Sequence, residues 1–116
     1  MKHIKTGTKR SEFTILANTR NLQAAVMTLR PGGTSDEEPS NEHPQSEQWI
    51  FVIAGTGEAL VGKQRDGLRR VKIADNSLLL IEKRELHQIR NTGRRHLRTI
   101  NFYAPPAYDD KGAPRA

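Results

Sequence analysis

Residues 43–57, HPQSEQWIFVIAGTG, decide how this chain folds. The run Gln48–Ile53 is rich in aromatic and β-branched residues, which favour β-strands. Because side chains alternate along a strand, Gln48 and Trp49 point to opposite faces, and the alternation favours Gln48 on the inner one. The glycines at 55 and 57 then predict a tight turn or a bulge. The stretch therefore predicts a strand that begins among polar residues and ends at a glycine turn.

Short strands broken by turns continue on both sides of this stretch. The expected strands are residues 12–16, 21–29, 58–61, 70–73, 78–81, 86–90 and 97–103. Turn signals separate them, and the Asp66-Gly67 pair is typical of a hairpin. No long segment carries the 3.6-residue stripe of an amphipathic helix. The pattern predicts an all-β fold, a jelly-roll-like antiparallel sandwich or barrel.

The four residues 78–81, LLLI, form a fully apolar run, which is expected of a strand covered on both faces. Leu78 and Leu80, with Trp49 and Phe51, also suit a sheet-to-sheet interface with a second copy of the chain. The same residues are equally expected in the core of one chain.

Composition narrows the class of protein. The 116 residues suit one compact domain, and the lack of cysteine excludes disulfides, thiolate catalysis, zinc fingers and iron–sulfur clusters. Lysine and arginine number 19 against 13 acidic residues, giving a net charge of +6. The basic residues are spread over several segments and no RRM, KH or recognition-helix pattern is present, so a nucleic-acid partner is not expected. Without an apolar stretch of ~20 residues or a secretion signal, a soluble cytoplasmic protein is expected.

Two of the four histidines, His43 and His87, stand at the edges of expected strands. Imidazole is the commonest ligand for first-row transition metals, and two histidines with a carboxylate or an amide suit a metal site. Judged on their spacing alone, a structural role for both histidines is the more frequent alternative.

Two stretches resemble the paired motifs of the cupin family. Residues 43–57 are similar to the first motif, which reads G, five residues, HxH, three or four residues, E, six residues, G. Residues 76–91, NSLLLIEKRELHQIRN, are similar to the second, which reads G, five residues, PxG, two residues, H, three residues, N. The resemblance covers roughly residues 22–104. It implies a small cupin of the cupin 2 type, a double-stranded β-helix with a pocket inside.

The resemblance also divides the chain. Residues 1–20 are expected to form an N-terminal extension and the first strand, and residues 21–104 the cupin barrel. Residues 105–116, which hold a Pro-Pro pair, are expected to form an extended, flexible tail.

In the first motif, Gly55 matches the closing glycine. Counting back from it places Gln48 at the ligand glutamate and His43 at the second histidine of HxH, while Asn41 replaces the first histidine. Glu47 stays an alternative ligand or base, because it matches the glutamate if the gap after His43 is three residues. Adjacent strand residues point to opposite faces, so only one of the two enters the barrel unless the strand bulges.

In the second motif, His87 and Asn91 match the histidine and the asparagine, whereas Asn76, Glu82 and Arg84 replace the glycine, proline and glycine. These replacements affect a turn and leave the matched histidine in place. They bring the charged residues around Glu82 near the barrel mouth.

The ligand set implied by the resemblance is His43, Gln48 and His87, with Asn41 as an optional fourth. Such a set favours Zn, Ni, Fe or Mn, and its open positions suit water or substrate. A pocket containing Glu82, Arg90 and Asn91 is expected beside it. The missing ligands also weaken affinity, so a metal-free pocket is an alternative.

Two functions therefore stay open. The first is a metal-dependent enzyme, an oxygenase or an isomerase, that acts on a small polar molecule. The second is a non-catalytic binding or sensing cupin with weak or absent metal. In the second case Arg84, Arg90 and Arg98 would receive a carboxylate or phosphate group. The family resemblance also implies a homodimer.

Overall fold

The structure is a computed structural model that describes residues 1–8 and 11–115. The described residues form eight strands and two short 3-10 helices, so the predicted all-β class is confirmed. The elements are η1 Thr6–Thr8, β1 Phe13–Asn18, β2 Gln23–Leu29, β3 Glu47–Ala54, β4 Gly57–Gly62, η2 Arg65–Gly67, β5 Arg69–Ile73, β6 Leu78–Ile81, β7 Leu86–Asn91 and β8 Leu97–Ala104. Among these residues, no helix is long and apolar enough to cross a membrane.

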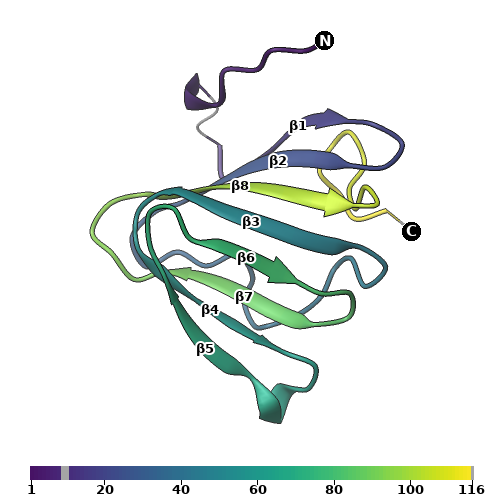
Figure 1. Cartoon of the computed structure of the whole chain (residues 1–116). Helices are drawn as coiled ribbons and strands as arrows, with labels where there is room; N and C mark the ends of the chain where they lie inside the picture. Colours follow the sequence, from purple (N-terminus) through teal and green to yellow (C-terminus); the bar gives the residue numbers. More distant parts are fainter. Residues whose placement is uncertain (9–10, 116) are drawn as a thin grey trace.

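The strands make two antiparallel sheets that face each other (Figure 1). The larger sheet has the order β1-β2-β8-β3-β6, and the smaller has the order β5-β4-β7. The long connection after β2 runs along β7, where Thr34 pairs with Arg90 and Ser40 pairs with His87. This connection, expected as a loop, therefore extends the smaller sheet and closes the barrel on that side.

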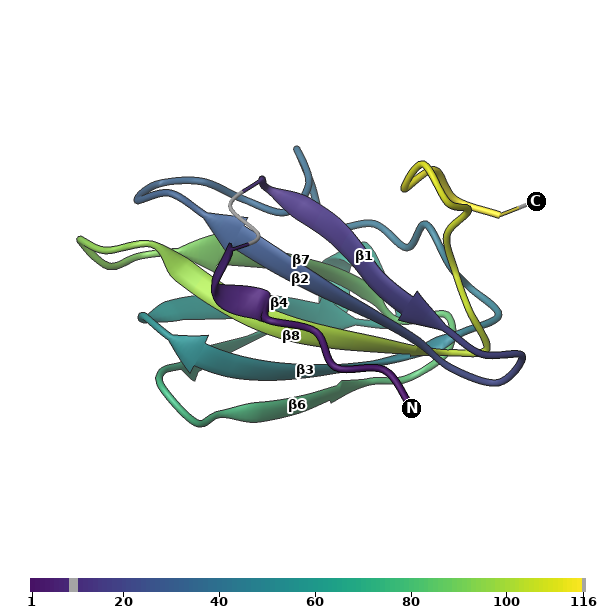
Figure 2. The ribbon, with the colours of Figure 1, turned by 90° about the horizontal axis from the view of Figure 1, so that it is seen from above.

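Residues 1–8 lie against the larger sheet, on the face away from the barrel interior (Figure 2). Arg98, which points outward from β8, donates a hydrogen bond of 2.9 Å to the carbonyl oxygen of Thr6. The N-terminal segment thus covers part of the outer face and takes no part in the interior.

The core lies between the two sheets, and its side chains change from apolar to polar along the length of the barrel. One cluster is apolar and is made of Met27, Leu29, Ile50, Val52, Ala59, Ile73, Ile81, Ile89 and Leu97. Along β8 the inward side chains run from Leu97 through Thr99 and Asn101 to Tyr103, all of them buried. One end of the barrel is therefore apolar and the other polar, and the polar end receives the candidate site.

Strand β6 is not covered on both faces, so that prediction is wrong. Leu78 and Leu80 are 61% and 42% exposed, whereas Ile81 is buried in the core. The reason is topological, because β6 is the edge strand of the larger sheet and no third layer covers it.

The turns keep the backbone shape that the motifs require. Asn76 and Arg84 replace motif glycines, and both have left-handed backbones, with φ of 72° and 68°. Gly55 has φ of 108°, and a Cβ placed there would lie 2.8 Å from the carbonyl oxygen of His96. The turn at Gly55 therefore requires glycine, whereas the other two turns tolerate side chains at a conformational cost.

The segment after β8, expected as an extended tail, is compact in the structure. Tyr108 pairs with Pro114, and Tyr108 is buried against the end of the barrel. The side-chain amide of Gln23 holds this segment, since its Oε1 accepts the N–H groups of Ala107 and Tyr108 and its Nε2 donates to the Tyr108 carbonyl. The segment thus covers the polar end of the barrel.

Candidate metal and ligand site

A cavity of about 260 Å³ opens at the polar end of the barrel. Its polar lining includes Gln48 of β3, His87 of β7, and Asn101 and Tyr103 of β8. Tyr108 of the C-terminal segment closes one side. Elements from both sheets and from the tail therefore meet at this cavity.

The two candidate histidines come together beside the cavity, and His87 lines it. The ring centroids of His43 and His87 lie 5.1 Å apart, and both side chains are buried. Nδ1 of His43 lies 3.4 Å from the carbonyl oxygen of Ser46, and Nδ1 of His87 lies 3.2 Å from that of Glu85. The backbone carbonyl at Nδ1 of His87 favours the tautomer that leaves Nε2 of this ring free to bind a metal.

Gln48 is oriented toward His43 by its neighbours. Its Nε2 donates to the hydroxyl of Tyr103 at 3.2 Å, and Asn101 donates to the same hydroxyl at 3.3 Å. This fixes Oε1 of Gln48 at 3.0 Å from Nε2 of His43. Without a metal, one proton on Nε2 satisfies both atoms. If His43 instead carries its proton on Nδ1, facing the carbonyl of Ser46, the lone pairs of its Nε2 and of Oε1 of Gln48 point toward the same position.

His87 is neutral at physiological pH. Burial lowers its pKa to about 4, and nearby His43 adds to the effect against the hydrogen bond to Glu85. A neutral imidazole is the form that binds metals. Within the described residues, Nε2 of His87 has no hydrogen-bond partner, and this side chain lines the cavity.

These residues fit a weakly held transition metal. Among residues 1–8 and 11–115, no group of three or more His, Cys, Asp and Glu side chains is placed to hold a metal ion. The set therefore depends on the amide of Gln48 as its third donor. Two imidazoles and an amide carry no negative charge, so they hold a divalent ion less tightly than a set with a carboxylate.

The other two ligand candidates are engaged elsewhere. Asn41 donates to the carbonyl oxygen of Glu85 at 3.1 Å and accepts the N–H of His43 at 2.7 Å. It thus braces the segment of His43 against the turn that precedes His87. Glu47 accepts the indole N–H of Trp49 at 3.0 Å on the outer face of β3, so Gln48 is the residue that enters the barrel.

The three residues expected around the pocket do not line the cavity. Asn91 is buried at the far end of β7, where its amide donates to the carbonyls of Leu29 and Arg95. Glu82 is exposed in the turn between β6 and β7. Arg90 lies on the outer face of the smaller sheet. The motif match therefore predicted the strand of Arg90 and Asn91 and the turn of Glu82, but it did not predict that their side chains lie away from the cavity.

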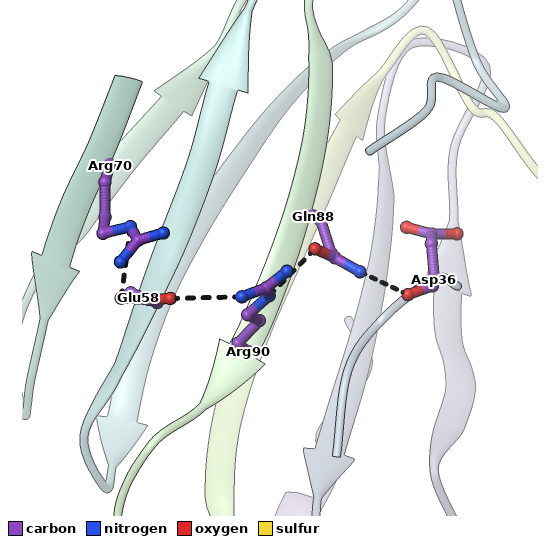
Figure 3. A network of polar contacts seen from close by, with 5 residues as sticks. All are labelled: Asp36, Glu58, Arg70, Gln88 and Arg90. Atoms are coloured by element: carbon purple, nitrogen blue, oxygen red, sulfur yellow. Dashed lines mark hydrogen bonds and ion pairs between the residues drawn. The ribbon is translucent and has the colours of Figure 1, made fainter. Parts of the chain in front are cut away.

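Arg90 belongs to a chain of polar contacts that reaches Asp36, in the connection after β2 (Figure 3). Glu58 pairs with Arg70 at 3.7 Å and with Arg90 at 3.6 Å. Arg90 donates to Gln88, and Gln88 donates at 2.7 Å to the carbonyl oxygen of Asp36. The network therefore fixes the backbone from which the Asp36 side chain enters the cavity.

Several lining residues were not singled out from the sequence. Burial raises the pKa of Tyr103 to about 12 and also raises the pKa of Tyr108, so both phenols stay protonated near neutral pH. Tyr108 donates to the carboxylate of Glu42 at 3.2 Å. The alternation along β8 could have placed Asn101 and Tyr103 inside, whereas no periodic signal marks Tyr108.

A two-sheet antiparallel barrel of this strand order has the double-stranded β-helix fold. A family model described as "Cupin domain" matches residues 25–103. The chain belongs to the cupin family.

A curated protein is similar in sequence, and solved structures share the fold. The chain is 28% identical over 94 residues to the uncharacterized protein YrkC of Bacillus subtilis strain 168, covering 80% of this chain and 49% of that protein. It thus spans about half the length of this curated relative. The crystal structure of BH2720 from Bacillus halodurans matches with a TM-score of 0.82 and 28% identity, covering 95% of this chain and 80% of that one. A conserved double-stranded β-helix protein from Klebsiella pneumoniae matches with a TM-score of 0.67 and 20% identity, over 78% and 73% of the two chains.

Proposed function

We propose that this cupin binds a divalent transition metal ion through His43, Gln48 and His87, together with a small polar molecule in the same cavity. The observation that carries the proposal is the pair of buried imidazoles, 5.1 Å apart, with each Nδ1 facing a backbone carbonyl. The Tyr103 hydroxyl turns the amide oxygen of Gln48 toward the same place. Zn, Ni, Fe and Mn are the ions that suit this donor set.

The chemistry of such a site would come from the bound ion and from His43, Tyr103 and Tyr108 around it. A bound ion would polarise an oxygen of the small molecule as a Lewis acid, which suits an oxygenase or an isomerase. His43 can shift its proton from Nε2 to Nδ1, where the carbonyl of Ser46 accepts it. The buried Tyr103 hydroxyl and the covering Tyr108 keep bulk water from the donors.

A second candidate function is binding or sensing without catalysis, with weak or absent metal. Two observations favour it: the ligand set carries no carboxylate, and both polar atoms of Asn41 are engaged with the backbone. The two candidates differ in metal affinity, which is therefore the quantity to measure first.

The test is metal content and metal affinity of the untagged protein, by plasma mass spectrometry and calorimetry. We expect near-stoichiometric binding of one of the four ions and loss of binding in His87→Ala. Gln48→Glu should tighten binding about tenfold or more, because it supplies the missing negative charge. His96→Ala is the matched control, since His96 is exposed in the turn between β7 and β8. Unchanged metal binding in His87→Ala would overturn the ligand assignment.

A further inference from the structure

The cavity has a charge opposite to that of the chain. Its lining includes the carboxylates of Glu12, Asp36 and Glu42 and no lysine or arginine of the described part of the chain, although the net charge is +6. The ion pairs found among residues 1–8 and 11–115 all lie elsewhere and involve Glu38 and Glu58. Negative charge therefore faces the cavity without a basic partner from the protein.

Asp36 is partly buried and Glu42 is exposed, and the charge of Glu42 acts on the Asp36 carboxyl. Asp36 is held by Ser35, whose hydroxyl donates to Oδ2 at 3.0 Å. Burial raises the pKa of Asp36, and the neighbouring Glu42 carboxylate adds to the rise. Glu42 in turn receives the hydroxyl of Tyr108 at 3.2 Å. A positive group between Asp36 and Glu42 would relieve this repulsion.

Aromatic rings line the same cavity. Phe13 and Tyr108 have ring centroids 5.1 Å apart, and Tyr103 and Tyr108 have centroids 5.0 Å apart, both in edge-to-face arrangements. Aromatic faces beside carboxylates attract organic cations, because the ring quadrupole and the carboxylate charge act together.

His87 adds a neutral coordinating group to the same cavity. His87 is only 6% exposed and lines the cavity, yet its Nε2 has no hydrogen-bond partner within the described residues. Among the described residues, no fully buried side-chain nitrogen or oxygen lacks a hydrogen-bond partner, so this nitrogen is open to the cavity, where an ion or a ligand atom can reach it. The cavity thus offers a coordinating end at His87 and an acidic, aromatic end at Asp36, Glu42 and Tyr108.

We propose that the small polar molecule is an organic cation, an amine or quaternary ammonium compound with a hydroxyl group. Its charged head lies among the rings of Phe13 and Tyr108 and the carboxylates of Asp36 and Glu42. Its hydroxyl points toward His87 and the metal. This inference rests on the proposed function for the ligand's polar end, whereas its charge follows from the acidic end alone. Anionic ligands are disfavoured, because Arg90 and Arg98 point outward, away from the cavity.

The test compares probes that differ in charge. Choline and ethanolamine are titrated by calorimetry against 3,3-dimethylbutan-1-ol, the neutral isostere of choline, and against acetate. We expect choline or ethanolamine to bind at least about tenfold more tightly than the isostere and acetate. Equal binding of choline and its isostere, or tighter binding of acetate, would overturn the inference.

Charge-neutralising variants locate the cation. Asp36→Asn and Glu42→Gln should each weaken binding of the cationic probe about fivefold or more and leave the isostere unchanged. Glu38→Gln is the matched control, since Glu38 pairs with Arg65 on the surface, and it should bind like the unmodified protein. If neither cavity variant weakens the cationic probe more than the control does, the acidic end is not its site and the inference fails.

Zinc titration of the same samples separates this inference from the proposed function. Zinc binding without choline or ethanolamine binding overturns the cation inference and leaves the metal site intact. Cation binding without zinc binding supports the inference and overturns the metal part of the proposed function. The absence of both overturns both.

Discussion

Asn91 shows what a single buried side chain does for this barrel. Its Nδ2 donates to the carbonyls of Leu29 and Arg95, each at 2.8 Å, and its Oδ1 accepts the N–H of Gly93. Asn91→Ala leaves these groups without partners, so we expect the free energy of unfolding to fall by about 2–4 kcal/mol. Urea unfolding measures this loss.

The matched control for Asn91→Ala is Asn21→Ala. Asn21 is exposed in the turn between β1 and β2, so its replacement should change stability by no more than about 0.5 kcal/mol. Equal stability of the two variants would contradict the structural role of Asn91. A loss of metal binding in the folded Asn91→Ala protein would instead favour the pocket role expected from the motif.

The two tyrosines of the chain give a prediction in base. Burial raises the pKa of Tyr103 to about 12 and raises the pKa of Tyr108, whereas an unfolded tyrosine ionises near 10. Because the folded pKa values exceed the unfolded ones, stability is fully present below pH 10 and falls as the pH rises toward 12. For Tyr103 alone, the shift corresponds to about 2 kcal/mol lost by pH 12.

Absorbance at the tyrosinate band, followed together with circular dichroism, measures this behaviour. We expect no tyrosinate signal in the folded protein until the pH is well above 10, and its appearance together with unfolding. A signal with a midpoint near 10 in a protein that keeps its folded circular dichroism would show that these phenols are not buried.

At the scale of the element, the turn between β6 and β7 carries a conformational cost. Arg84 has φ of 68°, a backbone region that an arginine reaches only at a cost and glycine reaches freely. Arg84→Gly is therefore expected to raise the free energy of unfolding by about 0.5–1 kcal/mol. Thermal and urea unfolding give this value.

Lys83→Gly is the control for that turn. Lys83 is the preceding residue and is not among the positive-φ residues, so glycine there only adds freedom to the unfolded chain and should lower stability. If both variants destabilise the protein equally, the left-handed strain at Arg84 is not significant.

The elements also show how far the sequence leads. Alternation along β3 and β8 predicts which side chains face inward, because the period of a strand leaves one choice once the apolar face is known. Motif spacing predicts the meeting of His43 and His87, since it encodes how far His43 stands before β3 and where His87 falls in β7. Tyr108 escapes prediction, because its ring packs against Phe13 and its backbone is held by Gln23, which are 95 and 85 residues away. The outward direction of Arg90 follows from alternation with His87, which motif matching ignores.

At the scale of the whole molecule, the outer face of the larger sheet carries two apolar rows. Trp49 pairs with Leu80 on one side and with Phe102 on the other. Phe51 pairs likewise with Leu78 and Ile100. Such a contiguous patch is unusual on the surface of a monomer. We propose that a second copy covers it, because two identical apolar rows can pack face to face about a two-fold axis.

Phe51→Arg tests this proposal at the centre of the patch, where Phe51 is 37% exposed. We expect the unmodified chain to sediment with twice the mass of one chain, and the variant to sediment as a monomer, because an arginine buried against its own copy has no partner for its charge. Leu22→Arg is the matched control, since Leu22 is 41% exposed in the turn between β1 and β2, outside the patch, and this variant should stay a dimer.

A monomer at all concentrations of the unmodified chain would contradict the dimer. If Leu22→Arg loses the dimer and Phe51→Arg keeps it, the interface lies at the β1–β2 end of the barrel instead. The C-terminal segment covers the cavity at that end, so assembly would then be coupled to ligand entry.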